Sequence, residues 1–153
     1  MAKEVVSKEI FELLEKHLVD IEEEGEQILE KYFPDITAER DSFTKLLTNY
    51  IKQLEKYISK YEVSERAENN CPFIIIGSIV EVEDLESKEV EKYQIVSPFE
   101  NNLEVDFDFA SYLSPLGKAL LLKKIDDKVE VETPMGKFTY KVKSIEIPAE
   151  ILN

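Results

Sequence analysis

Residues 11–37 read FELLEKHLVDIEEEGEQILEKYFPDIT, and this stretch decides the architecture of the first half of the chain. Its apolar positions recur at alternating intervals of three and four residues, the spacing of a seam along one face of a helix. The closing FPDIT, residues 33–37, joins a proline to turn-forming residues, so we expect the helix to end there and the chain to reverse. The seam consists of Phe11, Leu14, Leu18, Ile21, Gly25, Ile28 and Tyr32.

A second seam with the same alternation follows the turn. Two adjacent seams joined by so short a turn predict an antiparallel coiled-coil hairpin over residues 1–67. At ~1.5 Å per residue, residues 1–33 would extend up to roughly 45–50 Å. Gly25 lies on the first seam at a cost in helix propensity, which favours close approach of the partner helix. The second seam consists of Phe43, Leu47, Tyr50, Leu54, Tyr57 and Tyr61.

Composition and charge exclude several classes of function. The chain has 153 residues and a net charge of −14, with 10 Lys/Arg against 17 Asp/Glu in residues 1–69 and 9 against 16 in residues 70–153. Binding to nucleic acid depends on clustered Lys and Arg, so we expect no independent DNA or RNA binding. No apolar run is long enough to span a membrane, and the first residues lack the apolar core of a signal peptide, so we expect no membrane association and a cytoplasmic location.

The residue types needed for an independent enzyme site are scarce. Cys71 and His17 are the only residues of their kind, which excludes an intramolecular disulfide and a Cys/His metal cluster. We expect both residues to be structural. Only four glycines are present, and none forms a phosphate-binding loop. We therefore expect no independent enzyme site and no cofactor held by the chain alone.

The second half of the chain has the pattern of a small sheet domain. ENNCPF, residues 68–73, breaks the helical period and marks the boundary of a second domain over residues 68–153. Four stretches rich in β-branched and aromatic residues follow, and residues 134–136 (PMG) join the last two as a hairpin. The sequence therefore predicts an α+β chain, with an antiparallel sheet and one short helix after the helical hairpin. The stretches are residues 73–85, 89–98, 127–134 and 137–147.

The short helix is predicted by SPLGKALLLKK, residues 114–124. Ser114 suits the N-cap, Pro115 suits the first helical position, and Lys123 and Lys124 complement the C-terminal end of the helix dipole. About three helical turns are expected.

Together these segments resemble the bacterial Gre family of transcription elongation factors. The resemblance covers residues 73–148, where glycine-serine precedes a strand, serine-proline precedes a short helix and a proline-x-glycine hairpin closes the domain, in that order. It implies an FKBP-like second domain that docks at the rim of the secondary channel of RNA polymerase, with the coiled coil reaching down that channel. The docking contact would fall on Ser114 and Pro115, and Ser114 has two open interpretations: capping alone, or capping together with docking.

The family's acidic tip maps onto PDITAERDSF, residues 34–43, with a departure. The cleavage factors of the family carry an aspartate followed three residues later by a glutamate. Asp35 matches the aspartate, Ala38 stands in the glutamate's place, and the nearest acids are Glu39 and Asp41. The resemblance implies that Asp35, Glu39 and Asp41 assist catalysis, with Asp35 and Glu39 as ligands of a Mg²⁺ ion shared with the polymerase.

The residues alone leave a structural alternative at this turn. Asp35 or Thr37 is suited to cap the second helix, and acids in its first turn are favoured by the helix dipole.

A further departure from the family is Leu122, which stands where a glycine is common in the segment after the serine-proline helix.

Three functions remain open at this stage. The first is a factor that inserts its coiled coil into the polymerase and stimulates cleavage of backtracked transcripts. The second is a related channel binder that inhibits or modulates transcription without cleavage.

The third, of a different class, is a stand-alone FKBP-like peptide-binding module with an aromatic pocket. We expect a monomer, and self-association through the hairpin would favour this third function. Its candidate pocket residues are Phe73, Tyr93, Phe99, Phe107, Phe109, Tyr112, Phe138 and Tyr140.

Overall fold

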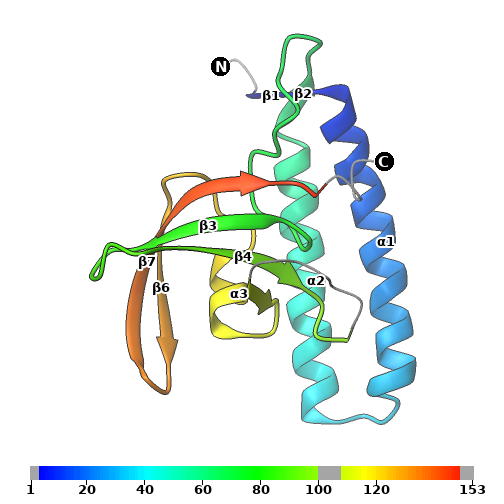
Figure 1. Ribbon diagram of the computed structural model, residues 1–153. Coiled ribbons are helices and arrows are strands. Elements are labelled where there is room, and N and C mark those ends of the chain that lie inside the picture. Colours follow the sequence, from blue (N-terminus) through cyan, green and yellow to red (C-terminus); the bar gives the residue numbers. More distant parts are fainter. Residues whose placement is uncertain (1–3, 100–107, 149–153) are drawn as a thin grey trace. The chain divides into compact units, whose positions relative to one another are not determined.

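The computed structural model describes residues 4–99 and 108–148 (Figure 1). The chain forms two compact units, Met1–Asn69 and Asn70–Asn153. The sequence placed this boundary two residues earlier, between residues 67 and 68.

The first unit is a helical hairpin closed by two short strands. Helix α1 spans Lys8–Tyr32 and helix α2 spans Ala38–Ile58. Strands β1 (Glu4–Val6) and β2 (Tyr61–Val63) flank them and pair in parallel. The expected hairpin is confirmed, but its helices are shorter than the sequence suggested. The residues just before α1 and just after α2 form the strands β1 and β2 instead of continuing the helices. The 25 residues of α1 span roughly 37 Å.

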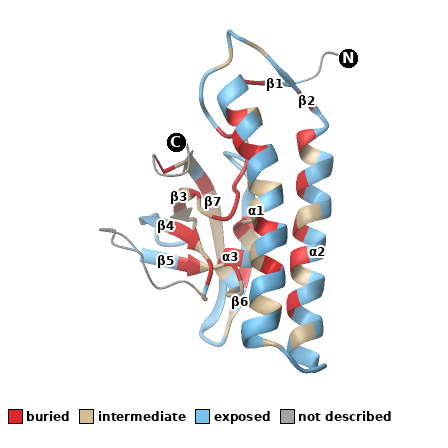
Figure 2. Cartoon of the chain, turned by 90° about the vertical axis from the view of Figure 1, so that its right-hand side faces the viewer, coloured by how far each residue is buried: buried red, intermediate tan, exposed pale blue. Residues whose placement is uncertain are grey.

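Burial follows the predicted seams in part (Figure 2). On α1 the seam residues Leu14, Ile21 and Gly25 are buried, whereas Tyr32 is 44% exposed. The second seam is buried up to Leu54, and its last predicted position, Tyr61, is buried in β2 instead of on α2. Its buried helical members are Phe43, Leu47, Tyr50 and Leu54.

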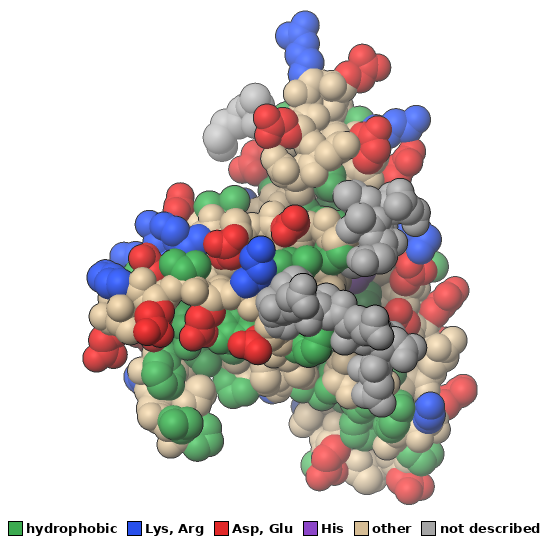
Figure 3. Space-filling model, viewed as in Figure 1, with side chains coloured by type: hydrophobic (Ala, Val, Ile, Leu, Met, Phe, Trp, Pro, Cys, Tyr) green, Lys and Arg blue, Asp and Glu red, His purple; other side chains and the backbone are tan. Residues whose placement is uncertain are grey.

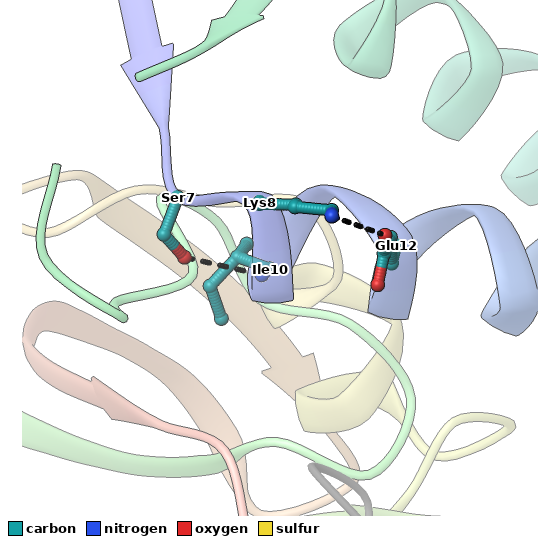
Figure 4. A network of polar contacts seen from close by, with 4 residues as sticks. All are labelled: Ser7, Lys8, Ile10 and Glu12. Carbon is teal, nitrogen blue, oxygen red and sulfur yellow. Dashed lines mark hydrogen bonds and ion pairs between the residues drawn. The ribbon is translucent and has the colours of Figure 1, made fainter. Parts of the chain in front are cut away.

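The start of α1 is fixed by a side-chain cap (Figure 4). Ser7 has extended backbone angles, and its Oγ accepts a hydrogen bond of 3.1 Å from the backbone N of Ile10. Ser7 is only 3% exposed, so this bond satisfies a buried hydroxyl as well as a free helix amide. Lys8 and Glu12 form an exposed ion pair of 3.9 Å on the next turn.

The second unit contains a five-stranded sheet with the order β5-β4-β3-β7-β6. Alternating burial on β3 and β6 shows that one sheet face is covered. In the space-filling view of the molecule, charged side chains are visible on the surface of this unit (Figure 3). The strands are β3 (Ile79–Asp84), β4 (Val90–Val96), β5 (Asp108–Ser111), β6 (Lys128–Thr133) and β7 (Gly136–Glu146).

The sheet is mixed, which corrects the expectation of a purely antiparallel one. Strand β5 was not predicted, and it pairs in parallel with β4, from Tyr93↔Asp108 to Val96↔Ser111. Residues 97–107 separate the two strands in the sequence. Of these, residues 100–107 lie outside the described residues.

The first predicted strand is shorter than expected because the backbone turns at Gly77, whose φ is 105°. Ser78 stabilises this turn, since its Oγ accepts from the backbone N of Ile75 at 2.9 Å. The predicted hairpin between β6 and β7 is confirmed, with Thr133 paired to Gly136.

Helix α3 spans Pro115–Leu120, about half the length that the sequence suggested. Its C-cap is Leu121, and Leu122 has a φ of 66°, in the left-handed region that ends helices. Among the described residues, no helix is long and apolar enough to cross a bilayer.

Candidate functional site

The turn between α1 and α2 is held by contacts from both helices. Arg40 of α2 donates from Nη1 to the carbonyl oxygen of Phe33 at 2.6 Å. The Phe33 ring stacks on Phe43, with centroids 5.4 Å apart and planes 23° apart. These two contacts therefore hold the backbone of the turn in place. Neither contact could be recognised from the sequence.

Thr37 is the N-cap of α2, which settles the choice between Thr37 and Asp35. Its Oγ1 accepts from the backbone N of Arg40 at 3.1 Å, and its φ of −133° is that of an extended residue. Asp35 lies two residues before the cap and is exposed. The carboxylate of Asp35 is therefore not used to start the helix.

The three candidate carboxylates of Asp35, Glu39 and Asp41 are all exposed at this end of the hairpin. Asp41 forms an ion pair of 3.0 Å with Lys45, one turn along α2. Ala38 is the first residue of α2, so Glu39 is the second. Within residues 4–99 and 108–148, Asp35 and Glu39 form no ion pair and Asp41 forms this one.

Ile36 is a feature of the turn that sequence reasoning missed. Its side chain is 99% exposed, between Asp35 and Thr37. A turn of five residues is too short to bury an isoleucine. The shortness of the turn could therefore have predicted from the sequence that Ile36 is exposed. The end of the hairpin therefore presents an apolar side chain together with its carboxylates.

The hairpin end does not make a complete metal site by itself. Across the described part of the chain, no group of three or more His, Cys, Asp or Glu side chains is placed to hold a metal ion. Mg²⁺ in proteins often takes only one or two carboxylates and completes its shell with water and substrate oxygens. The exposed carboxylates of Asp35 and Glu39 fit that partial role, and their use as ligands stays a prediction.

The second candidate site is the start of α3. The Oγ of Ser114 accepts from the backbone N of Gly117 at 3.1 Å and donates to the carbonyl oxygen of Ser111 at 2.7 Å. The capping role of Ser114 is therefore present, and its hydroxyl is engaged as both donor and acceptor. Pro115 is exposed at the first helical position, so it is the better placed of the two for a contact with a partner.

The single histidine and the single cysteine of the chain are structural. His17 lies with Nε2 2.8 Å from the Tyr50 hydroxyl, and burial lowers its pKa to about 4, while Asp20 raises it and Lys16 lowers it further. Cys71 is 4% exposed, and burial raises the pKa of its thiol to about 11. A neutral histidine and a protonated thiol at pH 7 agree with the roles expected from the sequence.

Two members of the aromatic set proposed for a peptide pocket are buried in the core. Phe73 and Tyr112 are 0% and 2% exposed, so they belong to the core. Phe109 is 42% exposed on the edge strand β5, and Phe107 lies outside the described residues. The stand-alone peptide-binding function gains no support from this placement.

Comparison with known proteins gives a family match over the second unit. A family model described as "Transcription elongation factor, GreA/GreB, C-term" matches residues 69–147, just over half of the chain. A GreA of Solidesulfovibrio magneticus is 34% identical over 111 residues, which cover 72% of this chain and 65% of that protein. A GreB of Xanthomonas axonopodis is 33% identical over 96 residues, covering 63% of this chain and 56% of that protein. The matches thus span less than two thirds of these relatives' own length.

Two solved structures also align with most of the chain. A crystal structure of GreA factor homolog 1 from Thermus thermophilus aligns at 28% identity over 95% of this chain and 99% of that chain, with a TM-score of 0.42. A GreA/GreB elongation factor from Nitrosomonas europaea aligns at 22% identity over 94% of this chain and 99% of that chain, with a TM-score of 0.49.

Proposed function

The chain belongs to the GreA/GreB family of transcription elongation factors, and on that premise we propose that it binds RNA polymerase and places its helical hairpin in the secondary channel. There it stimulates cleavage of backtracked transcripts by the polymerase. The second unit, which carries the family match, is the docking unit, and the hairpin is the part that reaches the active centre. The protein is an accessory factor, because the reaction takes place at the polymerase's own catalytic site.

The observation that carries this proposal is the exposure of Asp35 and Glu39 at the end of a hairpin roughly 37 Å long. The turn that bears Asp35 is held by Arg40 and by the stacked pair Phe33 and Phe43, so the carboxylates are presented from a fixed backbone. Fixed placement matters because a displacement of about 1 Å can cost a reaction ~100-fold.

Magnesium is the ion that these carboxylates suit, since hard cations prefer oxygen ligands. When shared with the polymerase, such an ion supplies charge stabilisation to the attacking and leaving oxygens of a phosphodiester. Asp35 and Glu39 are the residues that would hold it. Asp41, paired with Lys45, contributes negative charge nearby and helps to keep the first turn of α2 folded.

A second function, channel binding without cleavage, is favoured by one specific observation. Ala38 occupies the first position of α2, where the cleavage factors have their glutamate, and Glu39 is one residue further on. One residue rotates a side chain by ~100° around a helix, which directs the Glu39 carboxylate away from the position of that glutamate. In this case the protein occupies the channel and inhibits or modulates transcription.

Transcript shortening in stalled elongation complexes distinguishes the two functions. Cleavage by the unaltered protein that is lost in an Asp35→Ala, Glu39→Ala, Asp41→Ala triple variant supports tip-assisted cleavage. The matched control is Glu22→Ala, Glu23→Ala, Glu26→Ala, which removes the same charge from exposed positions of α1. Polymerase binding without any shortening supports the second function, and equal shortening by both triple variants contradicts the role of the tip.

A further inference from the structure

A basic pocket lies between α3 and β6, in a unit that is otherwise acidic. It has a volume of about 310 Å³. Helix α3 and the segment after it supply one wall, and β6 supplies the other. The pocket is lined by Lys118, Ala119, Lys123, Lys128, Val129 and Glu130, and we refer to it as the lysine pocket.

The lysine pocket concentrates positive charge. It holds three of the nine Lys/Arg residues in 70–153, a segment that carries 16 Asp/Glu. The ion pairs described in this unit use other lysines, namely Lys92, Lys137 and Lys141. Lys118, Lys123 and Lys128 form no ion pair within residues 4–99 and 108–148, so their charge is available to a partner.

The backbone that bears the three lysines is fixed. The carbonyl oxygen of Lys123 accepts from the backbone N of Ile74 at 2.9 Å, and the backbone N of Leu122 donates to the carbonyl oxygen of Ile74 at 2.7 Å. Lys128 is paired with Lys141 in the β6–β7 ladder. Lys118 follows Gly117, where an added Cβ would overlap the carbonyl oxygen of Ser111, so α3 is seated closely on the end of β5. Binding therefore needs only side-chain ordering, which limits its entropic cost.

We propose that the lysine pocket docks an acidic segment of a protein partner, with at least two Asp or Glu side chains contacting Lys118, Lys123 and Lys128. This inference rests on the proposed function, in which that partner is RNA polymerase. Charge complementarity selects the occupant, because the local excess of positive charge is opposite to that of the rest of the unit. A nucleic-acid backbone is disfavoured, since its many phosphates would extend beyond the pocket onto an acidic surface.

Two neighbouring features bear on this assignment, one in its favour and one against it. Lys118 is one helical turn from the exposed Pro115, so the pocket continues the predicted docking turn on the same helix. Glu130 lies in the pocket lining and would repel an acidic partner, so its removal should strengthen binding.

Equilibrium binding of the full chain to core RNA polymerase, measured at low and moderate salt, tests the inference. We expect Lys118→Glu with Lys128→Glu to weaken binding at least 10-fold at low salt, and Lys118→Gln with Lys128→Gln to weaken it about 3-fold. Glu130→Gln should tighten binding about 2- to 3-fold. The matched control, Lys137→Glu with Lys143→Glu, makes the same charge change on the same unit outside the pocket.

The outcomes separate this inference from the proposed function. If the unaltered chain binds and the pocket reversal has no more effect than the control, the lysine pocket is excluded while polymerase binding stands. If the unaltered chain does not bind at all, both proposals are overturned. Binding of naked duplex DNA or RNA that depends on these lysines would also overturn the assignment to an acidic protein segment.

Discussion

At the scale of single residues, His17 is a buried base whose neutral form the fold favours. Its folded-state pKa of about 4 lies below the ordinary value of 6.5, so the unfolded chain binds more protons between these pH values. The resulting stability is present above pH 6.5 and is lost as the pH falls towards 4. A shift of this size corresponds to about 3 kcal/mol.

Denaturant unfolding of the wild type and of His17→Gln between pH 7 and pH 4 measures this contribution. The variant should lose less stability than the wild type over that range, because titrating carboxylates contribute to both proteins and cancel. Equal losses in the two proteins would show that His17 is not held neutral.

Lys88 and Leu122 both have backbone angles in the left-handed region, and we expect replacement by glycine to change the stability of the chain in opposite directions at the two positions. Lys88 has a φ of 66° and is exposed, so Lys88→Gly should stabilise the chain by up to about 1 kcal/mol through relief of backbone strain. Leu122 has the same φ but is 5% exposed, and Leu122→Gly should destabilise it by about 2–4 kcal/mol, since loss of the buried side chain outweighs the relief. Thermal unfolding checks both signs, and stabilisation by Leu122→Gly would contradict the packing argument.

The residues of the hairpin end show where sequence reasoning stops. Exposure of Asp35, Glu39 and Asp41 could be anticipated, because charged residues in and beside a turn are rarely buried. The choice of Thr37 as cap could not, because Asp35 is an equally good capping type. The bond from Arg40 to Phe33 joins a side chain to a backbone carbonyl seven residues away, and no local pattern encodes it.

At the scale of elements, the two helices were predictable and several strands were not. Helices of 25 and 21 residues repeat their apolar period often enough to be unambiguous. Strands β1, β2 and β5 have three or four residues each, too few to show alternation. Their pairing is also distant in sequence, as with Glu4↔Tyr61, so it depends on the fold that surrounds them.

The two helical glycines serve different purposes, and alanine at each position distinguishes them. At Gly25 an added Cβ would meet the end of the Leu47 side chain, and at Gly117 it would meet the backbone of Ser111. Leu47 can shift, and alanine gains up to ~1 kcal/mol in helix propensity, so Gly25→Ala should lie within about 1 kcal/mol of the wild type. Gly117→Ala should cost about 2–3 kcal/mol, as expected of overpacking.

Chemical denaturation of the two glycine variants gives the comparison. The sequence anticipated a close approach at Gly25, and the neighbour is a side chain of α2, which is why a small cost is expected. A Gly25→Ala variant as unstable as Gly117→Ala would mean that the helices cannot adjust their spacing.

At the scale of the whole molecule, the proposed function assigns different tasks to the two units. The second unit sets affinity for the polymerase through Pro115 and its surroundings, and the hairpin end sets the rate of cleavage in the bound complex. Because the chain forms two compact units, a change in one should leave the folding of the other intact. The two tasks should therefore be separable by mutation.

Cleavage rates measured against protein concentration test this separation. Pro115→Ala removes an exposed contact without disturbing the Ser114 cap, so it should raise the half-saturating concentration and leave the rate at saturation unchanged. Asp35→Ala with Glu39→Ala should lower the saturated rate at least 10-fold with little change in half-saturation, because these carboxylates act only after docking. A Pro115→Ala defect that persists at saturation, or a tip variant rescued by higher concentration, would show that docking and catalysis are not divided between the units in this way.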